Sequence, residues 1–318
     1  RYIANPYLID GAKFDLRIYV VVTGFLPLRI YIHPAGLARF CTQKYASKAS
    51  TRKDRRRHLT NYAVNKRSKD FVRNEDAASD DVGHKRSYRS VLAHLEREGA
   101  DVGKLTREID DLIVKTILSI EVTVNTNMGL YVPSPSSCFE LFGFDVMLDD
   151  NLHPWLIEVN IAPSLCADSP LDKQIKGKLV TDILHLIQVR TYDRSGLQER
   201  LESEKKKRLQ GGGARTGRPN AENIRRRDVC AGKVQALQDL TAEDVELLED
   251  VEAEFGRMGS FRRIFPLDDE PTREWHKFFQ TPRFHNILVH EWVRRGNSFT
   301  PADYLAGRHK QAAAAAAA

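Results

Sequence analysis

The sequence lacks the features that mark membrane, secreted and zinc-finger proteins. Only four cysteines occur among 318 residues, and their spacing fits neither a disulfide framework nor a metal motif. We therefore interpret them as reduced thiols of a cytoplasmic protein. No apolar run approaches the roughly 20 residues that a membrane-spanning helix needs, and the start at Arg1 is not that of a signal peptide. The chain also lacks an initiator Met, so we expect a fragment of a longer protein.

The composition fits a globular protein with one unusually basic segment. The chain is 42% hydrophobic and 29% charged, which is enough for a substantial core and for one large or two ordinary domains. Its formal net charge is +6, and residues 194–233 contain twelve Lys or Arg against five Asp or Glu. Such a segment is often only a solvated linker, but it also suits an acidic partner.

A β-hairpin is predicted in the centre of the chain. Residues 142–148 and 155–160 are apolar runs, and residues 149–154 between them are rich in turn formers. Because side chains alternate along a strand, one face of this hairpin is expected to be buried. The side chains expected on that buried face are Phe144, Val146, Ile157 and Val159.

The other face of the hairpin carries an acidic group. With the turn centred in residues 149–154, Asp145 lies opposite Glu158, and Asn160 shares their face. Two facing carboxylates destabilise a sheet unless something compensates their charge. A solvent-exposed hairpin would explain them, and so would Mg²⁺, which prefers such oxygen ligands. The buried opposite face favours the metal.

Basic side chains share one face of an earlier strand. Lys13, Asp15 and Arg17 alternate with apolar residues. On spacing alone this row is a salt-bridge ladder, but beside a metal site its cations suit phosphate oxygens. A second strand is expected at residues 28–33, and Arg39, which follows it, is a further candidate phosphate ligand.

The remaining pattern predicts an α+β fold: an antiparallel sheet with flanking helices over residues 1–190. Periodicity and a capping signal predict helices at 88–98, 105–124, 173–189, 198–209, 241–255, 271–279 and 282–294. Loops are expected at 52–57, 68–87 and 126–135, a linker at 211–227, and an extended segment at 261–266. The predicted divisions are therefore a core at 1–190, a basic helix and linker at 191–240, a mainly helical extension at 241–311, and a poly-Ala run at 312–318 that is read as a placeholder.

Five motifs occur in order along the chain: K-F-D-L-R at 13–17, H-L-T-N-Y at 58–62, E-L-F-G-F-D-V-M-L-D at 140–149, P-W-L-I-E-V-N at 154–160 and S-P-L-D at 169–172, with F-R-R-I-F-P at 261–266 as a later echo. Together they resemble the tubulin tyrosine ligase-like family, most closely its polyglutamylase branch. The resemblance covers about residues 1–190 and implies an ATP-grasp fold. In the family, the segment with the first nucleotide-binding lysines precedes the hinge at which this chain begins. The resemblance therefore implies only the C-terminal part of the ATP-grasp domain, with activity belonging to a longer parent.

The resemblance also implies roles for individual residues. Nucleotide contacts are implied for Tyr2, Ile3, Lys13, Asp15, Thr60 and Asn61. Catalytic roles are implied for Lys13, Arg17 and Arg39, with the arginines binding phosphate or the reaction intermediate. Mg²⁺ ligation is implied for Asp145, Glu158 and Asn160, which agrees with the hairpin argument, and Lys176 matches a basic position near the acceptor substrate.

The function that the resemblance implies is an ATP-dependent tubulin polyglutamylase. Such a ligase joins glutamate to glutamate side chains of tubulin C-terminal tails through an acyl phosphate, with ATP and Mg²⁺ as cofactors. The basic segment 191–240 would bind microtubules, in the cytoplasm or in a ciliary axoneme or basal body. A microtubule-associated or axonemal structural protein that keeps the ligase fold without turnover is the alternative, and a glycine ligase is a variant of the first. Nucleic-acid binding is disfavoured because aromatic residues do not interleave the basic stretch.

Overall fold

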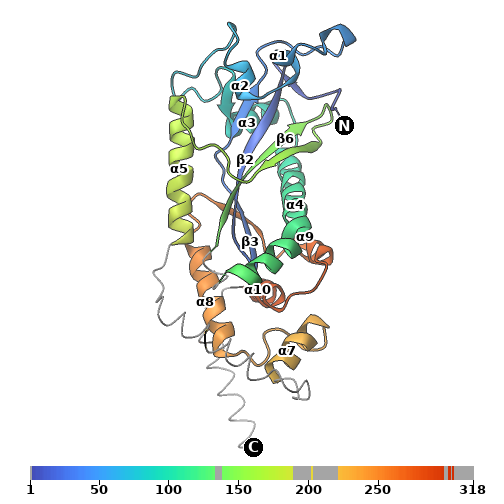
Figure 1. The fold of residues 1–318 in the computed structure, drawn as a ribbon, viewed down its shortest axis with the longest axis vertical. Helices are drawn as coiled ribbons and strands as arrows, with labels where there is room; N and C mark the ends of the chain where they lie inside the picture. The colour runs from blue at the N-terminus through green and yellow to red at the C-terminus, as the bar shows by residue number, and fades with distance from the viewer. Residues whose placement is uncertain are drawn as a thin grey trace, which may run out of the picture.

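The computed structural model describes residues 2–132, 138–188 and 221–296, with isolated positions at 202, 300, 301 and 303 (Figure 1). Its strands are β1 (Leu8–Ile9), β2 (Ala12–Phe25), β3 (Leu28–Ile32), β4 (Leu37–Phe40), β5 (Lys85–Ser87), β6 (Glu140–Leu148), β7 (Pro154–Asn160) and β8 (Arg262–Phe265). Its longer helices are α3 (Tyr88–Arg97), α4 (Val102–Tyr131), α5 (Pro170–Ile187), α7 (Ala221–Cys230), α8 (Ala242–Gly256) and α10 (Phe284–Arg295). Short helical turns are η1 (Ala49–Thr51), α1 (Arg55–His58), α2 (Tyr62–Asn65), α9 (Glu270–Trp275) and η3 (His276–Phe278). None of the helices within these ranges is both long and apolar enough to cross a membrane.

The long strand β2 is the axis of an antiparallel sheet. Its first half pairs with β4 and its second half with β3, while β6 runs along its other side. The sheet continues from β4 to β5, from β3 to β8 and from β6 to β7. This arrangement confirms the predicted α+β fold with an antiparallel sheet and flanking helices.

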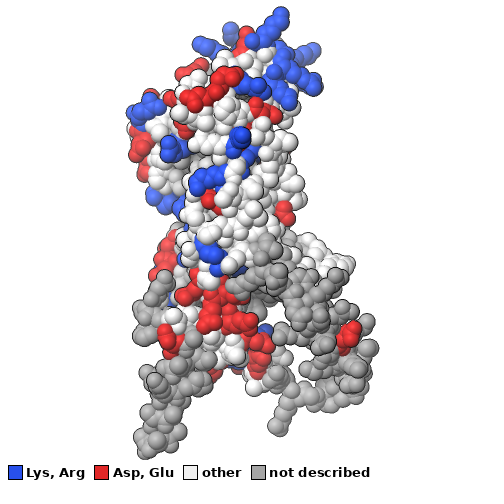
Figure 2. All heavy atoms as spheres, turned by 90° about the vertical axis from the view of Figure 1, so that its left-hand side faces the viewer, with Lys and Arg blue, Asp and Glu red and all other residues white. Residues whose placement is uncertain are grey.

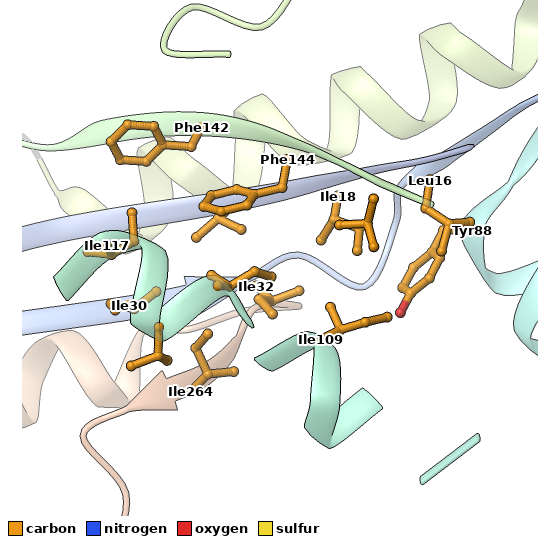
Figure 3. Close-up of a cluster of buried hydrophobic side chains, with 14 of the residues drawn as sticks. Leu16, Ile18, Ile30, Ile32, Tyr88, Ile109, Ile117, Phe142, Phe144 and Ile264 are labelled. Atoms are coloured by element: carbon orange, nitrogen blue, oxygen red, sulfur yellow. The ribbon is translucent and has the colours of Figure 1, made fainter. Parts of the chain in front are cut away.

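Helices cover both faces of the sheet (Figure 1). One face packs its apolar side chains against α3 and α4, and Figure 3 shows Phe144, Ile18 and Ile117 meeting in that core. The opposite face packs against α5 through Tyr19, Tyr31 and their neighbours. Even-numbered side chains at the start of β2 therefore enter the first core, and odd-numbered ones share the face of α5.

The predicted hairpin is confirmed as β6 and β7, with Asp145 paired to Glu158 as expected. One prediction within it is wrong. Ile157 is 48% exposed, because the pairing register shifts between Asp145 and Val146 and so places a bulge in β7. A bulge redirects the side chain of the extra residue, and Phe144 and Val146 alone of the predicted four are fully buried.

Several predicted loops contain regular structure. Residues 52–57 include most of α1, residues 68–87 contain β5, and α4 continues to Tyr131 through the loop expected at 126–135. Arg39 follows the second predicted strand, observed as β3, but it lies within a further strand, β4, that was not predicted. Short polar strands such as β5 have no apolar alternation, so only their pairing partners define them.

The extension beyond residue 190 contributes to the same sheet. Apart from residue 202, the basic helix expected at 198–209 lies outside the described residues, and the second half of the expected linker at 211–227 is occupied by the start of α7. Helix α8 begins with the predicted capping box of Thr241 and Asp244. The segment expected to be extended at 261–266 forms the edge strand β8, so the extension is not purely helical.

Candidate active site

Charged side chains from five strands lie on one face of the sheet. In one row across the strands, Lys85 pairs with Arg39, which pairs with Asp15. In the next row, Arg17 pairs with Asp145, which pairs with Glu158. Paired residues of antiparallel strands point to the same side, so the sheet itself brings together positions that are far apart in the sequence.

Asp145 is the centre of this group. It is 1% exposed, and its carboxylate accepts hydrogen bonds from Arg17 Nε at 2.5 Å and Arg17 Nη2 at 3.0 Å. Its Oδ2 also accepts one from Arg39 Nη2 at 2.7 Å. Burial alone would raise the pKa of Asp145, but the hydrogen bond from Arg17 and the charges of both guanidinium groups lower it below its ordinary value. Asp145 is therefore held as a carboxylate.

Arg39 joins Asp145 to Asp15. Its Nε donates to Asp15 Oδ1 at 2.8 Å, and its Nη2 also contacts Asp15 Oδ2. Thr60 Oγ1 donates to the same Asp15 Oδ2 at 2.8 Å. Thr60 therefore lies beside the charged residues of the sheet. The side chain of the adjacent Asn61 caps α2 by accepting a hydrogen bond from Ala63 N.

Gly143 makes room for Arg17. A Cβ at this position would lie 3.1 Å from Arg17 Cδ and 2.8 Å from the Cβ of Pro163. The guanidinium of Arg17 reaches Asp145 because its side chain lies directly over this glycine. Any larger residue here would push Arg17 away from its carboxylate partner.

Lys13 lies two residues before Asp15 on β2, beneath two aromatic rings. Its Nζ is 4.4 Å from the ring centroid of Tyr2 and 6.0 Å from that of Tyr45. Burial of the ammonium lowers the pKa of Lys13, against the opposing effects of Cys41 and Asp15. Tyr2 is 54% exposed, so one face of this ring cluster is open. Ile3 is only partly buried beside it.

A second charged cluster adjoins the first. Lys176, predicted near the acceptor, is buried on α5, where its Nζ lies 3.4 Å from Asp172 Oδ1 and donates to Cys166 O. Lys85 Nζ donates to Asp172 Oδ2 at 2.5 Å and lies 3.9 Å from the ring centroid of Tyr62. Burial lowers the pKa of Lys85, although Asp172 opposes this. Lys85 and Asp172 had no predicted role, and the only signal for Asp172 was its place in the S-P-L-D motif.

The oxygen ligands predicted for Mg²⁺ are on one face but unequally available. Asn160 Nδ2 donates to Glu158 Oε1 at 3.1 Å, so the amide oxygen of Asn160 and Oε2 of Glu158 take no part in this bond. Asp145 instead shares both its oxygens with arginines. Within the described ranges, no three His, Cys, Asp or Glu side chains converge as metal ligands. Two carboxylates and an amide still form a donor set that suits a hard cation, with Glu158 and Asn160 as its accessible members.

Comparison with known proteins identifies the family to which this site belongs. Residues 1–195 match the model of the tubulin-tyrosine ligase family. The chain therefore belongs to that family, and the predicted resemblance is confirmed.

Named relatives are similar over most of the chain. The chain is 38% identical over 96% of its length to tubulin monoglutamylase TTLL4 of Mus musculus. It is 40% identical over 85% of its length to tubulin polyglutamylase TTLL5 of Mus musculus and 41% identical over 88% to tubulin polyglutamylase ttll6 of Danio rerio. The matched parts cover 27%, 21% and 33% of those relatives, so the chain spans about a fifth to a third of their length.

Proposed function

We propose that the protein is an ATP-dependent ligase that adds glutamate to glutamate side chains of tubulin. The observation that carries the proposal is the pairing of Arg17 and Arg39 with Asp145 on one sheet face. It is supported by membership of the tubulin-tyrosine ligase family and by relatives named as tubulin monoglutamylases and polyglutamylases. On this proposal, residues 1–190 are the C-terminal part of an ATP-grasp domain, and residues 191–311 extend it.

The first step would be a phosphoryl transfer. An acceptor carboxylate oxygen attacks the γ-phosphorus of ATP, the bond from that phosphorus to the β,γ-bridging oxygen breaks, and ADP leaves. The protein has little covalent chemistry to do here, and its part is to position the groups and neutralise their charge. Arg17 and Arg39 are held in place by buried carboxylates, so their guanidinium groups need no reorganisation. Lys13, beside the rings of Tyr2 and Tyr45, would contact the nucleotide together with Ile3 and Thr60.

The second step would join the amino acid. The amine of free glutamate attacks the acyl carbon, loses a proton, and the tetrahedral intermediate expels phosphate. Negative charge gathers on the carbonyl oxygen in this step, and guanidinium donors suit that position. We assign Arg17 or Arg39 to it. Lys176 and Lys85, paired with Asp172, would provide positive charge near the acceptor.

Mg²⁺ is proposed as the metal cofactor, with Glu158 and Asn160 as its accessible ligands and Asp145 as the third. When bound, the metal would neutralise phosphate oxygens of ATP during the transfer. Asp145 would hold the metal with a carboxylate that also accepts hydrogen bonds from Arg17 and Arg39.

Tubulin tails, microtubules and glutamate are the partners that the proposal implies, and the cytoskeleton, including axonemes, is the implied location. The basic segment of residues 194–233 would strengthen attachment to the negatively charged microtubule surface. Replacing the eight Lys and Arg of residues 194–220 by Gln, which spares α7, should weaken sedimentation with microtubules most clearly at moderate salt. Equal sedimentation across a salt series would show that the segment is only a linker.

The test is mass spectrometry of tubulin tails after incubation with the protein in its longest natural form, ATP, Mg²⁺ and glutamate. Mass steps of one glutamyl unit are expected, and they should disappear in Glu158→Gln while its thermal unfolding stays unchanged. Glycine in place of glutamate tests the variant donor. Normal turnover in Glu158→Gln would remove the metal assignment. If the parent gives no mass steps but still sediments with microtubules, the structural alternative is supported instead.

A further inference from the structure

A concentration of positive charge lies beside the candidate active site, apart from residues 194–233. Residues 44–57 contain seven Lys or Arg and a single Asp, a net charge of +6. This equals the formal charge of the whole chain, so all other residues together sum to zero. We name residues 44–57 the basic ridge.

The charges of the basic ridge are exposed and mostly without counter-charges. Figure 2 shows Lys and Arg gathered at the end of the molecule where Figure 1 places α1. Arg52, Lys53 and Arg55 are exposed. Among the residues that the structure describes, only Arg57 of the ridge forms an ion pair, with Asp54 at 3.3 Å. An acidic partner would supply the missing negative charges.

The ridge is also an ordered surface. Asp54 caps α1 by accepting from Arg56 N at 3.1 Å, and Thr51 Oγ1 donates to Ala46 O at 2.9 Å. His58 Nε2 lies 3.0 Å from Thr51 O and so connects η1 to the end of α1. Holding seven like charges together costs free energy through their repulsion. That cost is offset when an acidic chain binds, and a surface already ordered loses little entropy in binding.

A layer of aromatic rings joins the ridge to the active-site row. His58, the last residue of α1, is 6.0 Å from the ring centroid of Tyr2 and 5.6 Å from that of Tyr45. Tyr2 OH also hydrogen-bonds His58 Nδ1 at 2.8 Å. Both tyrosine rings flank Lys13. The ridge is therefore separated from the charged row of β2 by one layer of side chains.

We propose that the basic ridge is a docking surface for the acidic polypeptide that carries the acceptor glutamate. It would bind carboxylates on either side of the modified residue and so hold the acceptor chain over the site. This inference rests on the proposed function, because it takes the acceptor to be a glutamate-rich chain. A polypeptide fits better than a nucleic acid, since binding of unpaired bases relies on open ring faces among the cations. Tyr45, the one aromatic residue of the ridge, is partly buried against His58, and the more exposed ring of Tyr2 already faces Lys13.

The experiment compares two triple variants of the full chain that lose the same charge. One is Arg52→Gln, Lys53→Gln and Arg55→Gln on the ridge. The other is Arg89→Gln, Lys104→Gln and Arg107→Gln on α3 and α4, which cover the opposite sheet face. The control residues are likewise exposed.

Binding is measured by fluorescence anisotropy with a labelled peptide of alternating Glu and Gly, without ATP. At low salt, each exposed charge facing an acidic chain contributes about a twofold change in Kd, so the ridge variant should bind about tenfold more weakly than the parent. The difference should largely vanish at about 0.5 M salt, where the Debye length falls to roughly 4 Å. The Kd of the control variant should stay within about twofold of that of the parent. A peptide of alternating Gln and Gly should bind to none of the three proteins.

Three outcomes would overturn the proposal. Equal binding by parent and ridge variant removes the docking surface, and an equal loss in the control variant reduces the effect to overall charge. Tighter binding of an oligothymidine of equal charge, with the same sensitivity to the ridge variant, assigns the surface to nucleic acid. Because the assay needs no turnover, these outcomes are distinguishable from failure of the ligase proposal, which is decided by glutamate addition alone.

Discussion

Glu254 of α8 connects the C-terminal extension to the central strands, and its replacement tests whether the extension belongs to the core. Its Oε1 accepts hydrogen bonds from Thr23 Oγ1 at 2.6 Å, Arg29 Nε at 2.8 Å and Tyr31 OH at 2.6 Å. Arg29 lies over Gly24, where a Cβ would be 2.8 Å from its Nη2. Glu254 and Arg29 are both buried. In Glu254→Ala the guanidinium of Arg29 would stay buried without its counter-charge.

The size of the expected loss of stability depends on the hydrogen bonds that Arg29 keeps in the variant. Removing one partner of a buried ion pair costs about 3–5 kcal/mol. Arg29 would still donate to Pro27 O at 3.0 Å and to Thr23 O at 3.3 Å, which moves the expected loss toward the lower end. The hydroxyls of Thr23 and Tyr31 lose their acceptor as well, at about 1 kcal/mol each. We therefore expect Glu254→Ala to lower the free energy of unfolding by about 5 kcal/mol.

Urea unfolding followed by tryptophan fluorescence measures this loss. The matched control is Glu246→Ala, an exposed carboxylate on the same helix, for which a change below about 0.5 kcal/mol is expected. The double variant Arg29→Met with Glu254→Leu should recover most of the stability, because it removes both charges together. A loss in Glu254→Ala within about 1 kcal/mol of the control would refute the reasoning and leave α8 as a loosely attached element.

Two further predictions concern other buried charges. Asp172→Asn should lower the free energy of unfolding by about 3 kcal/mol, because Lys85 and Lys176 would lose their shared counter-charge; denaturant unfolding beside the parent checks this, and a neutral result would contradict it. The stacked pair of His276 and His290 should make the protein less stable in acid: burial lowers the pKa of each to about 4, so the unfolded chain binds more protons between about pH 4 and pH 6.5 and stability falls as pH falls through that range. For His276 the loss in the free energy of unfolding reaches about 3 kcal/mol once the pH is below about 4. His276→Phe should therefore flatten the curve of melting temperature against pH over this interval.

The structure was easiest to predict where a short turn joins two strands whose apolar residues recur at every second position. The turn in residues 149–154 sets the register of β6 and β7, and so Asp145 meets Glu158 as predicted. The position of Ile157 could not be predicted in this way. A bulge adds one residue to one strand and leaves the apolar pattern of the sequence unchanged, so the exposed side chain becomes evident only from the pairing.

The partners of the site residues were harder to predict than the residues themselves. Arg17 and Arg39 were recognised as cations of the site, but their shared carboxylate depends on β4 and β6 lying on either side of β2. Lys85 lies in a polar segment with no apolar period, and only its pairing with Arg39 brings it to the same face. Long-range strand pairing thus supplied what local patterns could not.

The extension and the site are linked because one strand carries both. Thr23, near the end of β2, contacts Glu254, while Arg17 lies six residues earlier on the same strand, about 20 Å away at the rise of a β-strand. Glu254 is therefore too far from Arg17 for the two side chains to touch. Any loss of activity in Glu254→Ala should therefore follow the fraction of unfolded protein and shrink on cooling from the melting range toward room temperature. By contrast, the loss in Glu158→Gln should persist at every temperature, because there the fold is intact and only the proposed metal ligand is changed.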